Sequence, residues 1–167
     1  MLDRLVRQES AKTIIDPIVL RVERTLRHDR SALLAWEPVP LTAYGAGLPP
    51  FIQSSWVFIL RGGSASGAER HPNSHQRVMS YRGSGDLQVR PREQWQTNQL
   101  VSDPHAPLEN RWASIPVNVW HQAVVEQNNW VVVSFHTVPA HELIEERPDP
   151  SDPESTRQRT YLAEKVK

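Results

Sequence analysis

Histidine and carboxylate side chains lie close together near the middle of this sequence of 167 residues. Glu69 and His71 are separated by one residue, so a strand would place both side chains on the same face. His75 and Gln76 follow a Pro-Asn-Ser turn, and His121 comes fifty residues after His71. Imidazole nitrogens and a carboxylate that converge from separate strands suit Fe, Mn, Ni or Zn. The alternative is that these side chains are hydrogen-bonding groups at strand ends.

The region that must position these side chains has the pattern of an all-β domain. Short apolar stretches alternate with glycine, proline or asparagine turns at intervals of roughly 8–12 residues, which is typical of a sandwich or small barrel. The pattern predicts strands over residues 55–60, 78–81, 86–90, 112–115, 122–125 and 130–137. Residues 94–108 are polar and contain proline, which favours a loop or an irregular strand. We therefore predict a closed or nearly closed antiparallel barrel between about Ala32 and Pro139.

The first 31 residues are predicted to form an N-terminal arm and a first strand. Leu2, Leu5 and Val6 have helical spacing, whereas Asp16-Pro17 looks like a break. Apolar residues alternate with others over 18–22, which favours a strand that forms a hairpin with an extended segment at 32–41. The barrel is assigned to residues 32–140 and a charged C-terminal extension to 141–167. We expect this tail, strongly charged from Glu145, to lie on the surface, with a helix considered over 160–166.

Composition excludes several classes of function. Nineteen Lys and Arg residues balance nineteen Asp and Glu residues, so no overall field attracts nucleic acid or an anionic membrane. The absence of cysteine excludes disulfides and thiolate metal sites, and it fits a reducing compartment. No stretch reaches the roughly 18 apolar residues that span a bilayer. We therefore expect a cytoplasmic protein with no nucleic-acid or membrane partner.

A resemblance to the cupin superfamily rests on two segments. Residues 69–83 are similar to the motif G-x5-H-x-H-x3-4-E-x6-G, with Glu69 and His71 at the histidine positions and Gln76 at the glutamate. Residues 110–125 resemble the motif G-x5-P-x-G-x2-H-x3-N, in which Pro116 and His121 match. The other positions of the second motif, two glycines and an asparagine, are occupied by Asn110, Asn118 and Val125. The resemblance covers about residues 50–138.

The resemblance implies a double-stranded antiparallel β-helix, the cupin jelly-roll barrel, with a divalent metal bound inside it. Glu69, His71 and His121 would hold the metal. Gln76 would complete the set, or His75 would do so if a bulge redirected its side chain inward. Glu69 stands where the motif has a histidine, and Gln76 stands where it has a glutamate. The number of carboxylates is therefore the same as in the motif. Such a set leaves positions open for a substrate or dioxygen.

These observations predict a small metal-dependent cupin, an oxygenase or an isomerase that acts on a small polar organic molecule. One alternative is a non-catalytic cupin that binds a small ligand without metal, and another is a structural dimerisation module. His136 and His141 show no partner in the sequence and are interpreted as ordinary polar residues.

The resemblance also implies a homodimer, because cupins are often dimeric and unpaired edge strands tend to be covered. We expect the contact to use the hairpin over 18–41 or the apolar stripe of the N-terminal arm. A mass near 19.1 kDa by light scattering at micromolar concentration would contradict this prediction.

Overall fold

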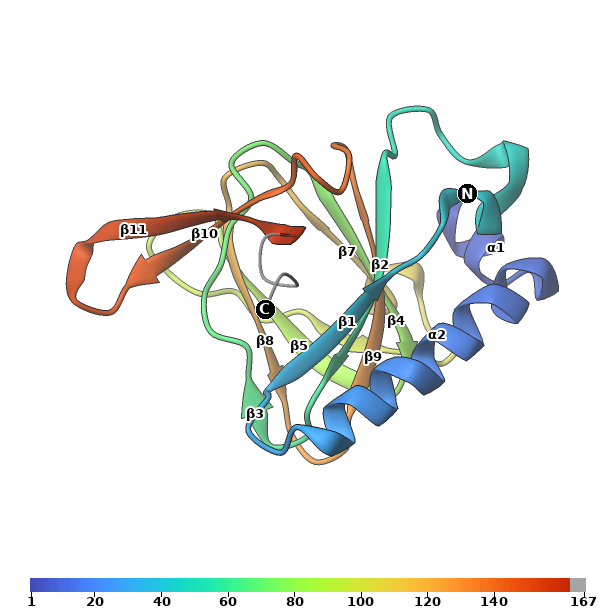
Figure 1. Cartoon of the computed structure of the whole chain (residues 1–167), viewed down its shortest axis with the longest axis horizontal. Helices are drawn as coiled ribbons and strands as arrows, with labels where there is room; N and C mark the ends of the chain where they lie inside the picture. Colours follow the sequence, from blue (N-terminus) through green and yellow to red (C-terminus); the bar gives the residue numbers. More distant parts are fainter. Residues whose placement is uncertain (163–167) are drawn as a thin grey trace.

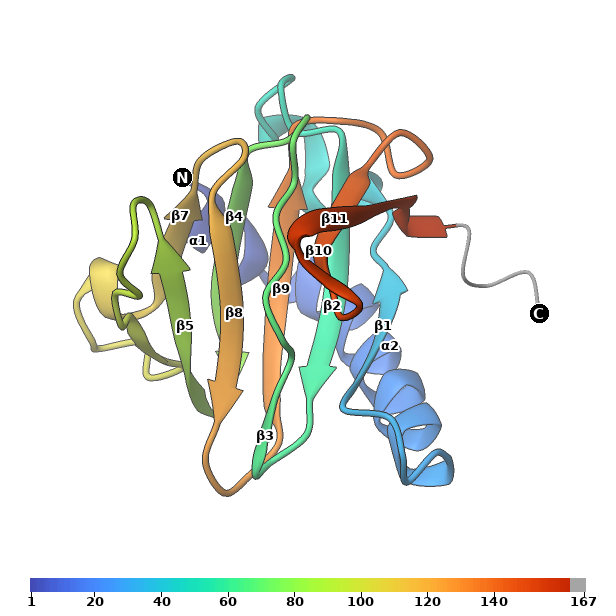
Figure 2. The same ribbon diagram turned by 90° about the vertical axis from the view of Figure 1, so that its left-hand side faces the viewer.

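Two antiparallel sheets face each other in the computed structural model, which describes residues 1–162 (Figures 1 and 2). The first sheet has the order β1 (Leu34–Pro38), β2 (Ser54–Leu60), β9 (Trp130–His136), β4 (Gln76–Arg82) and β7 (Trp112–Ile115). The second has the order β3 (Ser64–Ala65), β8 (Trp120–Val125), β5 (Ser84–Arg90) and β6 (Gln99–Val101). The predicted all-β class is confirmed. The two sheets share no ladder within the described residues, so the barrel is not closed.

Strand β9 shows why the predicted strands formed where the pattern placed them. Val131, Val133 and Phe135 pack in one hydrophobic cluster, and Trp130 and Val132 pack in another. Alternate side chains of a strand point to opposite faces, so β9 is buried on both faces of its sheet. One face meets a helix and the other faces the second sheet. The even-numbered residues of β9 therefore point into the space between the sheets.

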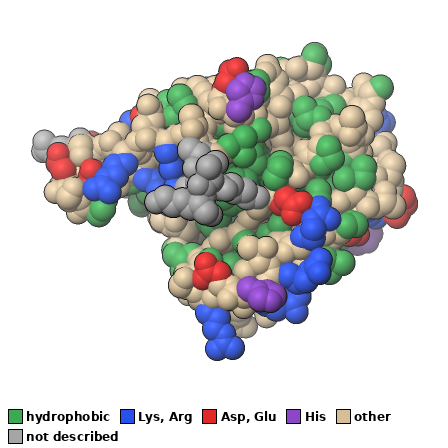
Figure 3. Space-filling view, in the orientation of Figure 1, with side chains coloured by type: hydrophobic (Ala, Val, Ile, Leu, Met, Phe, Trp, Pro, Cys, Tyr) green, Lys and Arg blue, Asp and Glu red, His purple; other side chains and the backbone are tan. Residues whose placement is uncertain are grey.

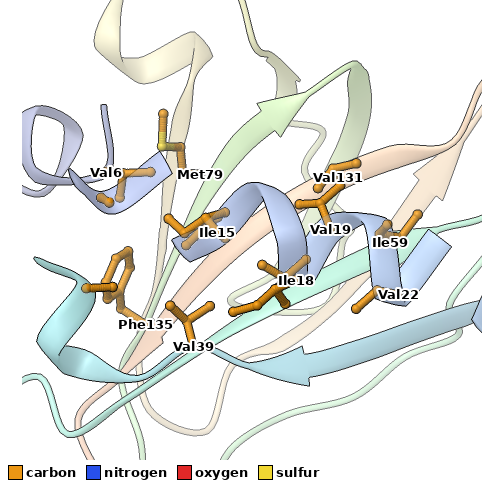
Figure 4. Packing of buried hydrophobic residues seen from close by; sticks show 14 of the residues in the cluster. Val6, Ile15, Ile18, Val19, Val22, Val39, Ile59, Met79, Val131 and Phe135 are labelled. Carbon is orange, nitrogen blue, oxygen red and sulfur yellow. The ribbon is translucent and has the colours of Figure 1, made fainter. Parts of the chain in front are cut away.

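The N-terminal segment is helical, which corrects the strand predicted over residues 18–22. Helix α1 (Leu2–Val6) is followed by the long helix α2 (Glu9–His28), which lies across the outer face of the first sheet (Figure 1). Its buried residues recur at helical spacing, lie over β1 and β2, and share one hydrophobic cluster with residues of β9. Figure 4 shows part of this set: Ala11, Ile15, Ile18, Val19, Val22 and Leu26. Leu20, which completed the apparent alternation, is 54% exposed.

Two further expectations for the N-terminus were wrong. Pro17 lies inside α2 and does not break it, although proline removes one backbone donor from a helix. The hairpin over 18–41 does not form, because β1 pairs with β2 instead. The apolar stripe of α2 is covered by its own chain, so neither element offered for dimer contact is available. The homodimer stays a prediction.

The charged C-terminal segment forms a hairpin of β10 (Ile144–Asp149) and β11 (Asp152–Thr160), which projects from the sheets (Figure 1). Acidic and basic side chains are interspersed on it in Figure 3. It is not simply a surface extension, because Glu145 is fully buried and accepts hydrogen bonds from Arg147 and Arg159. The helix considered over 160–166 lies mostly outside the described residues.

The remaining connections contain two 3-10 helices. One 3-10 helix spans Leu41–Gly47 and another spans Leu108–Asn110. Residues 94–108 were predicted as a loop or an irregular strand. Within this range the structure has one short strand, β6. Within residues 1–162, none of the helices is long and apolar enough to cross a membrane. The cytoplasmic location stays a prediction.

Candidate metal centre

Backbone pairing places Glu69 beside His121. The N–H of Glu69 donates to the carbonyl of His121 at 2.9 Å, and the N–H of His121 donates back at 2.8 Å. Two residues that exchange both bonds are directly opposite each other in an antiparallel pair, with their side chains on one face. Two backbone hydrogen bonds thus bring together two residues that are fifty-two positions apart in the sequence.

A turn before β8 holds His71 at the same place. Asn118, at a glycine position of the second cupin motif, has a φ of 66°, in the left-handed region that asparagine tolerates better than most residues. Its N–H donates to the carbonyl of His71 at 2.9 Å, and the N–H of Val119 donates to Pro116. The turn therefore ties the segment that carries His71 to the segment that carries His121.

The three side chains predicted as metal ligands converge. One ligand atom from each of Glu69, His71 and His121 can be chosen so that all three lie within 4.8 Å of one another. The two imidazole rings have centroids 5.3 Å apart. Both histidines are buried, and the Glu69 side chain is 15% exposed. The cluster thus lies largely inside the molecule, with only Glu69 partly exposed.

Hydrogen bonding fixes the tautomers of both rings. Nδ1 of His71 lies 2.8 Å from the carbonyl oxygen of Ile144, and Nδ1 of His121 lies 3.2 Å from that of Val119. A carbonyl only accepts, so each Nδ1 carries a proton, and in the neutral ring the lone pair is therefore on Nε2. Nε2 of His121 is buried without a hydrogen-bond partner, 3.4 Å from Oε1 of Glu69. Metal-binding histidines typically have this backbone-supported arrangement.

The second carboxylate oxygen of Glu69 is held by the C-terminal hairpin. Arg147 of β10 donates to Oε2 of Glu69 at 2.5 Å and to Oε1 of Glu145 at 2.6 Å. Burial alone raises the pKa of Glu69, but its interaction with His121 and the positive charge of Arg147 outweigh burial and lower it to about 2. Glu69 is therefore an anion, with Oε1 directed toward the histidines.

The pKa of His71 is also displaced. Burial and the neighbouring His121 lower it to about 4, so the ring is neutral at pH 7. A neutral imidazole is the form that binds a metal ion.

His136 also belongs to this region, although its position in the sequence indicated only an ordinary polar residue. It is fully buried, and its ring lies edge-on to that of His71, with the two ring centroids 5.0 Å apart. Burial, followed by electrostatic repulsion from the neighbouring His71 and His121 rings in their protonated forms, lowers its pKa well below the ordinary value. The period-two pattern of β9 was the available signal, because it places His136 on the same face as Trp130 and Val132.

The structure distinguishes the two residues proposed to complete the ligand set. Gln76 is buried at the start of β4, where it lines a cavity with Glu69 and His121, and its Oε1 has no hydrogen-bond partner. His75 is exposed in a surface depression with Arg77. The bulge that would turn His75 inward is absent, because β4 pairs regularly with β9 from Gln76 through Ser80. His75 is therefore not brought to the site.

Comparison with known proteins adds information on the fold. No protein-family model matches the sequence, and no curated protein matches it either. Among solved structures, the capsular polysaccharide assembling protein CapF from Staphylococcus aureus is similar, with a TM-score of 0.51 and 15% identity over 76% of this chain and 32% of CapF. The 11S globulin from Wrightia tinctoria, which has an auxin binding site, is also similar. Its TM-score is 0.52, with 15% identity over 69% of this chain and 27% of the globulin.

A third similar structure is a sugar phosphate isomerase of the cupin superfamily from Silicibacter pomeroyi, with a TM-score of 0.48 and 15% identity over 77% of this chain and 78% of the isomerase. The chain spans only about a third of CapF and about a quarter of the globulin. CapF and the globulin, which have TM-scores above 0.5, belong to the cupin superfamily. This chain therefore has the cupin fold, and the family resemblance inferred from its motifs is confirmed at the level of fold.

Proposed function

We propose that Glu69, His71 and His121 bind one divalent metal ion, which is Fe, Mn, Ni or Zn. The observation that carries this proposal is the buried Nε2 of His121, which has no hydrogen-bond partner and, in the neutral ring, presents its lone pair to the cluster. A buried acceptor without a partner costs free energy, and a cation placed there would satisfy it. Ligands of one ion lie roughly 3 Å apart at metal–nitrogen distances of about 2.0–2.1 Å, so the cluster would contract slightly.

The residues of the chain define what such a centre does. Glu69 supplies the negative charge, and Arg147 occupies its second oxygen, which favours coordination through Oε1 alone. Gln76 offers an unpartnered carbonyl oxygen to a ligand in the cavity. A bound metal would polarise a substrate or bind dioxygen at its open positions. We therefore propose an oxygenase or isomerase that acts on a small organic molecule.

A non-catalytic cupin that binds a small ligand without metal is the second candidate. One specific observation favours it: Arg147 already balances the charge of Glu69 at 2.5 Å, so the cluster does not need a cation for neutrality. In this role the same side chains would form hydrogen bonds to the ligand directly.

Elemental analysis combined with thermal unfolding tests the proposal. We expect the purified chain to hold close to one equivalent of Fe, Mn, Ni or Zn per molecule. A chelator should lower the unfolding temperature, and adding the metal back should restore it, because an ion that binds only the folded state stabilises that state. No bound metal, together with no thermal shift on adding any of the four ions, would contradict the metal centre. An organic molecule retained through purification would then support the second candidate.

A further inference from the structure

A small cavity lies between the two sheets, directly beside the candidate metal centre. Its volume is about 50 Å³. The residues that line it come from both sheets and from the end of the C-terminal hairpin. Its polar wall consists of Ser66, Glu69, Gln76, His121 and Tyr161.

The rest of the cavity is apolar. Its lining comes from β1, β2, β4, β5, β8 and β9 and consists of Leu34, Phe58, Leu60, Val78, Leu87, Ala123, Trp130 and Val132. Trp130 presents only its ring, because its Nε1 donates to Oγ of Ser80 at 2.9 Å. The cavity therefore joins a hydrocarbon wall to the polar groups of the centre.

The charges around the cavity restrict what it accepts. Glu69 is the only Asp, Glu, Lys or Arg side chain among its lining residues in the described part of the chain. The nearest basic residue to that carboxylate, Arg147, already donates to Glu69 and Glu145. An anionic group placed against the hydrocarbon wall would have no cation to pair with, and burying an unpaired charge is strongly unfavourable. The geometry thus disfavours carboxylate or phosphate on the inner part of a ligand.

We infer that the ligand is a small neutral molecule with an apolar body and one coordinating head. The head lies at Glu69, His121 and Gln76, and the body lies against the wall around Leu87 and Val132. This inference rests on the proposed metal centre and narrows its substrate class. It also replaces the small polar molecule expected from the sequence, because only one end of the cavity is polar.

Three hydroxamates with the same metal-binding head test the inference. Acetohydroxamate carries almost no tail, isovalerohydroxamate carries an apolar branched tail, and malonomonohydroxamate carries a carboxylate of the same shape. Calorimetry with the metal-loaded protein, with metal-free protein as the control, gives the three affinities. We expect isovalerohydroxamate to bind at least tenfold more tightly than malonomonohydroxamate, since its tail replaces water on an apolar wall. Equal or reversed affinities would overturn the inference. Failure of all three to bind would instead contradict the metal centre and, with it, the inference.

A pair of variants locates the tail. Ala123 of β8 lines the cavity, whereas Ala65 of β3 is exposed. Ala123→Leu should weaken isovalerohydroxamate at least tenfold and leave acetohydroxamate within about threefold, because leucine fills the space for the tail and spares the head. Ala65→Leu should change neither affinity. Undiminished isovalerohydroxamate binding by Ala123→Leu would place the tail elsewhere and refute the assignment.

Discussion

Replacing His121 with alanine is expected to lower metal affinity by at least about 100-fold. Loss of a direct ligand should exceed the roughly 10–100-fold effect of losing a group that only supports a ligand. His121 lies directly opposite Glu69 and supplies the unpartnered Nε2, so its removal leaves Glu69 and His71 as the remaining predicted His or Glu ligands. Elemental analysis after dialysis and calorimetric titration measure the loss.

His75→Ala is the matched control for this variant. His75 was a candidate ligand from the sequence, but it is exposed and lies in a surface depression with Arg77. We expect its replacement to leave metal content and affinity unchanged. Folding of His121→Ala is checked by circular dichroism and thermal unfolding without metal, and the loss of stability should be modest because the core is formed by hydrophobic packing. Full metal content in His121→Ala would show that the site assignment is wrong.

Replacing Gly85 with alanine is expected to destabilise the fold by about 2–3 kcal/mol, the cost typical of overpacking a tight core. A Cβ atom at this position would overlap the indole of Trp130, with Cδ2 at 2.6 Å. Trp130 is fully buried and is held by its hydrogen bond to Ser80, so the ring cannot move aside freely. Gly85 is therefore required by close packing between β5 and β9 and not by an unusual backbone conformation.

Gly47→Ala is the control for Gly85→Ala. Its added Cβ would lie 3.3 Å from Cδ2 of Leu5, the end of a flexible side chain that can shift by a few tenths of an ångström. We expect less than about 1 kcal/mol from this change. Urea unfolding of both variants gives the two free energies. Equal stability of Gly85→Ala and the unchanged protein would contradict the packing of Trp130 described above.

The sequence by itself determined the strands and the three converging side chains. Turn residues and β-branched or aromatic stretches define strands locally, so β2, β4, β5, β7, β8 and β9 lie close to their predicted positions. The pair Glu69 and His71 follows from the period of a strand. Its association with His121 followed from the spacing of two motifs, because the cupin fold places those motifs side by side.

The local sequence pattern could not distinguish a strand from a helix where a short apolar stretch fits both. Over residues 18–22, strand alternation and a helical stripe are both compatible with the positions of Ile18 and Val22. The sheet decided between them, because only a helix places Ile15, Ile18, Val19 and Val22 together in the hydrophobic cluster on the outer face of the first sheet. Pro17 did not prevent this, since the packing of a long helix outweighs one lost hydrogen bond.

Only the tertiary structure decided which other polar residues enter the site. Gln76 points inward and His75 outward because β4 pairs with β9 in regular register from Gln76 to Ser80, and the same ladder buries His136. The charged composition of the C-terminal segment indicated a solvated tail, but Arg147 and Arg159 pair with Glu145 and allow its burial. Sequence spacing reports which face of a strand a residue occupies, whereas burial of a charge depends on partners that are distant in sequence.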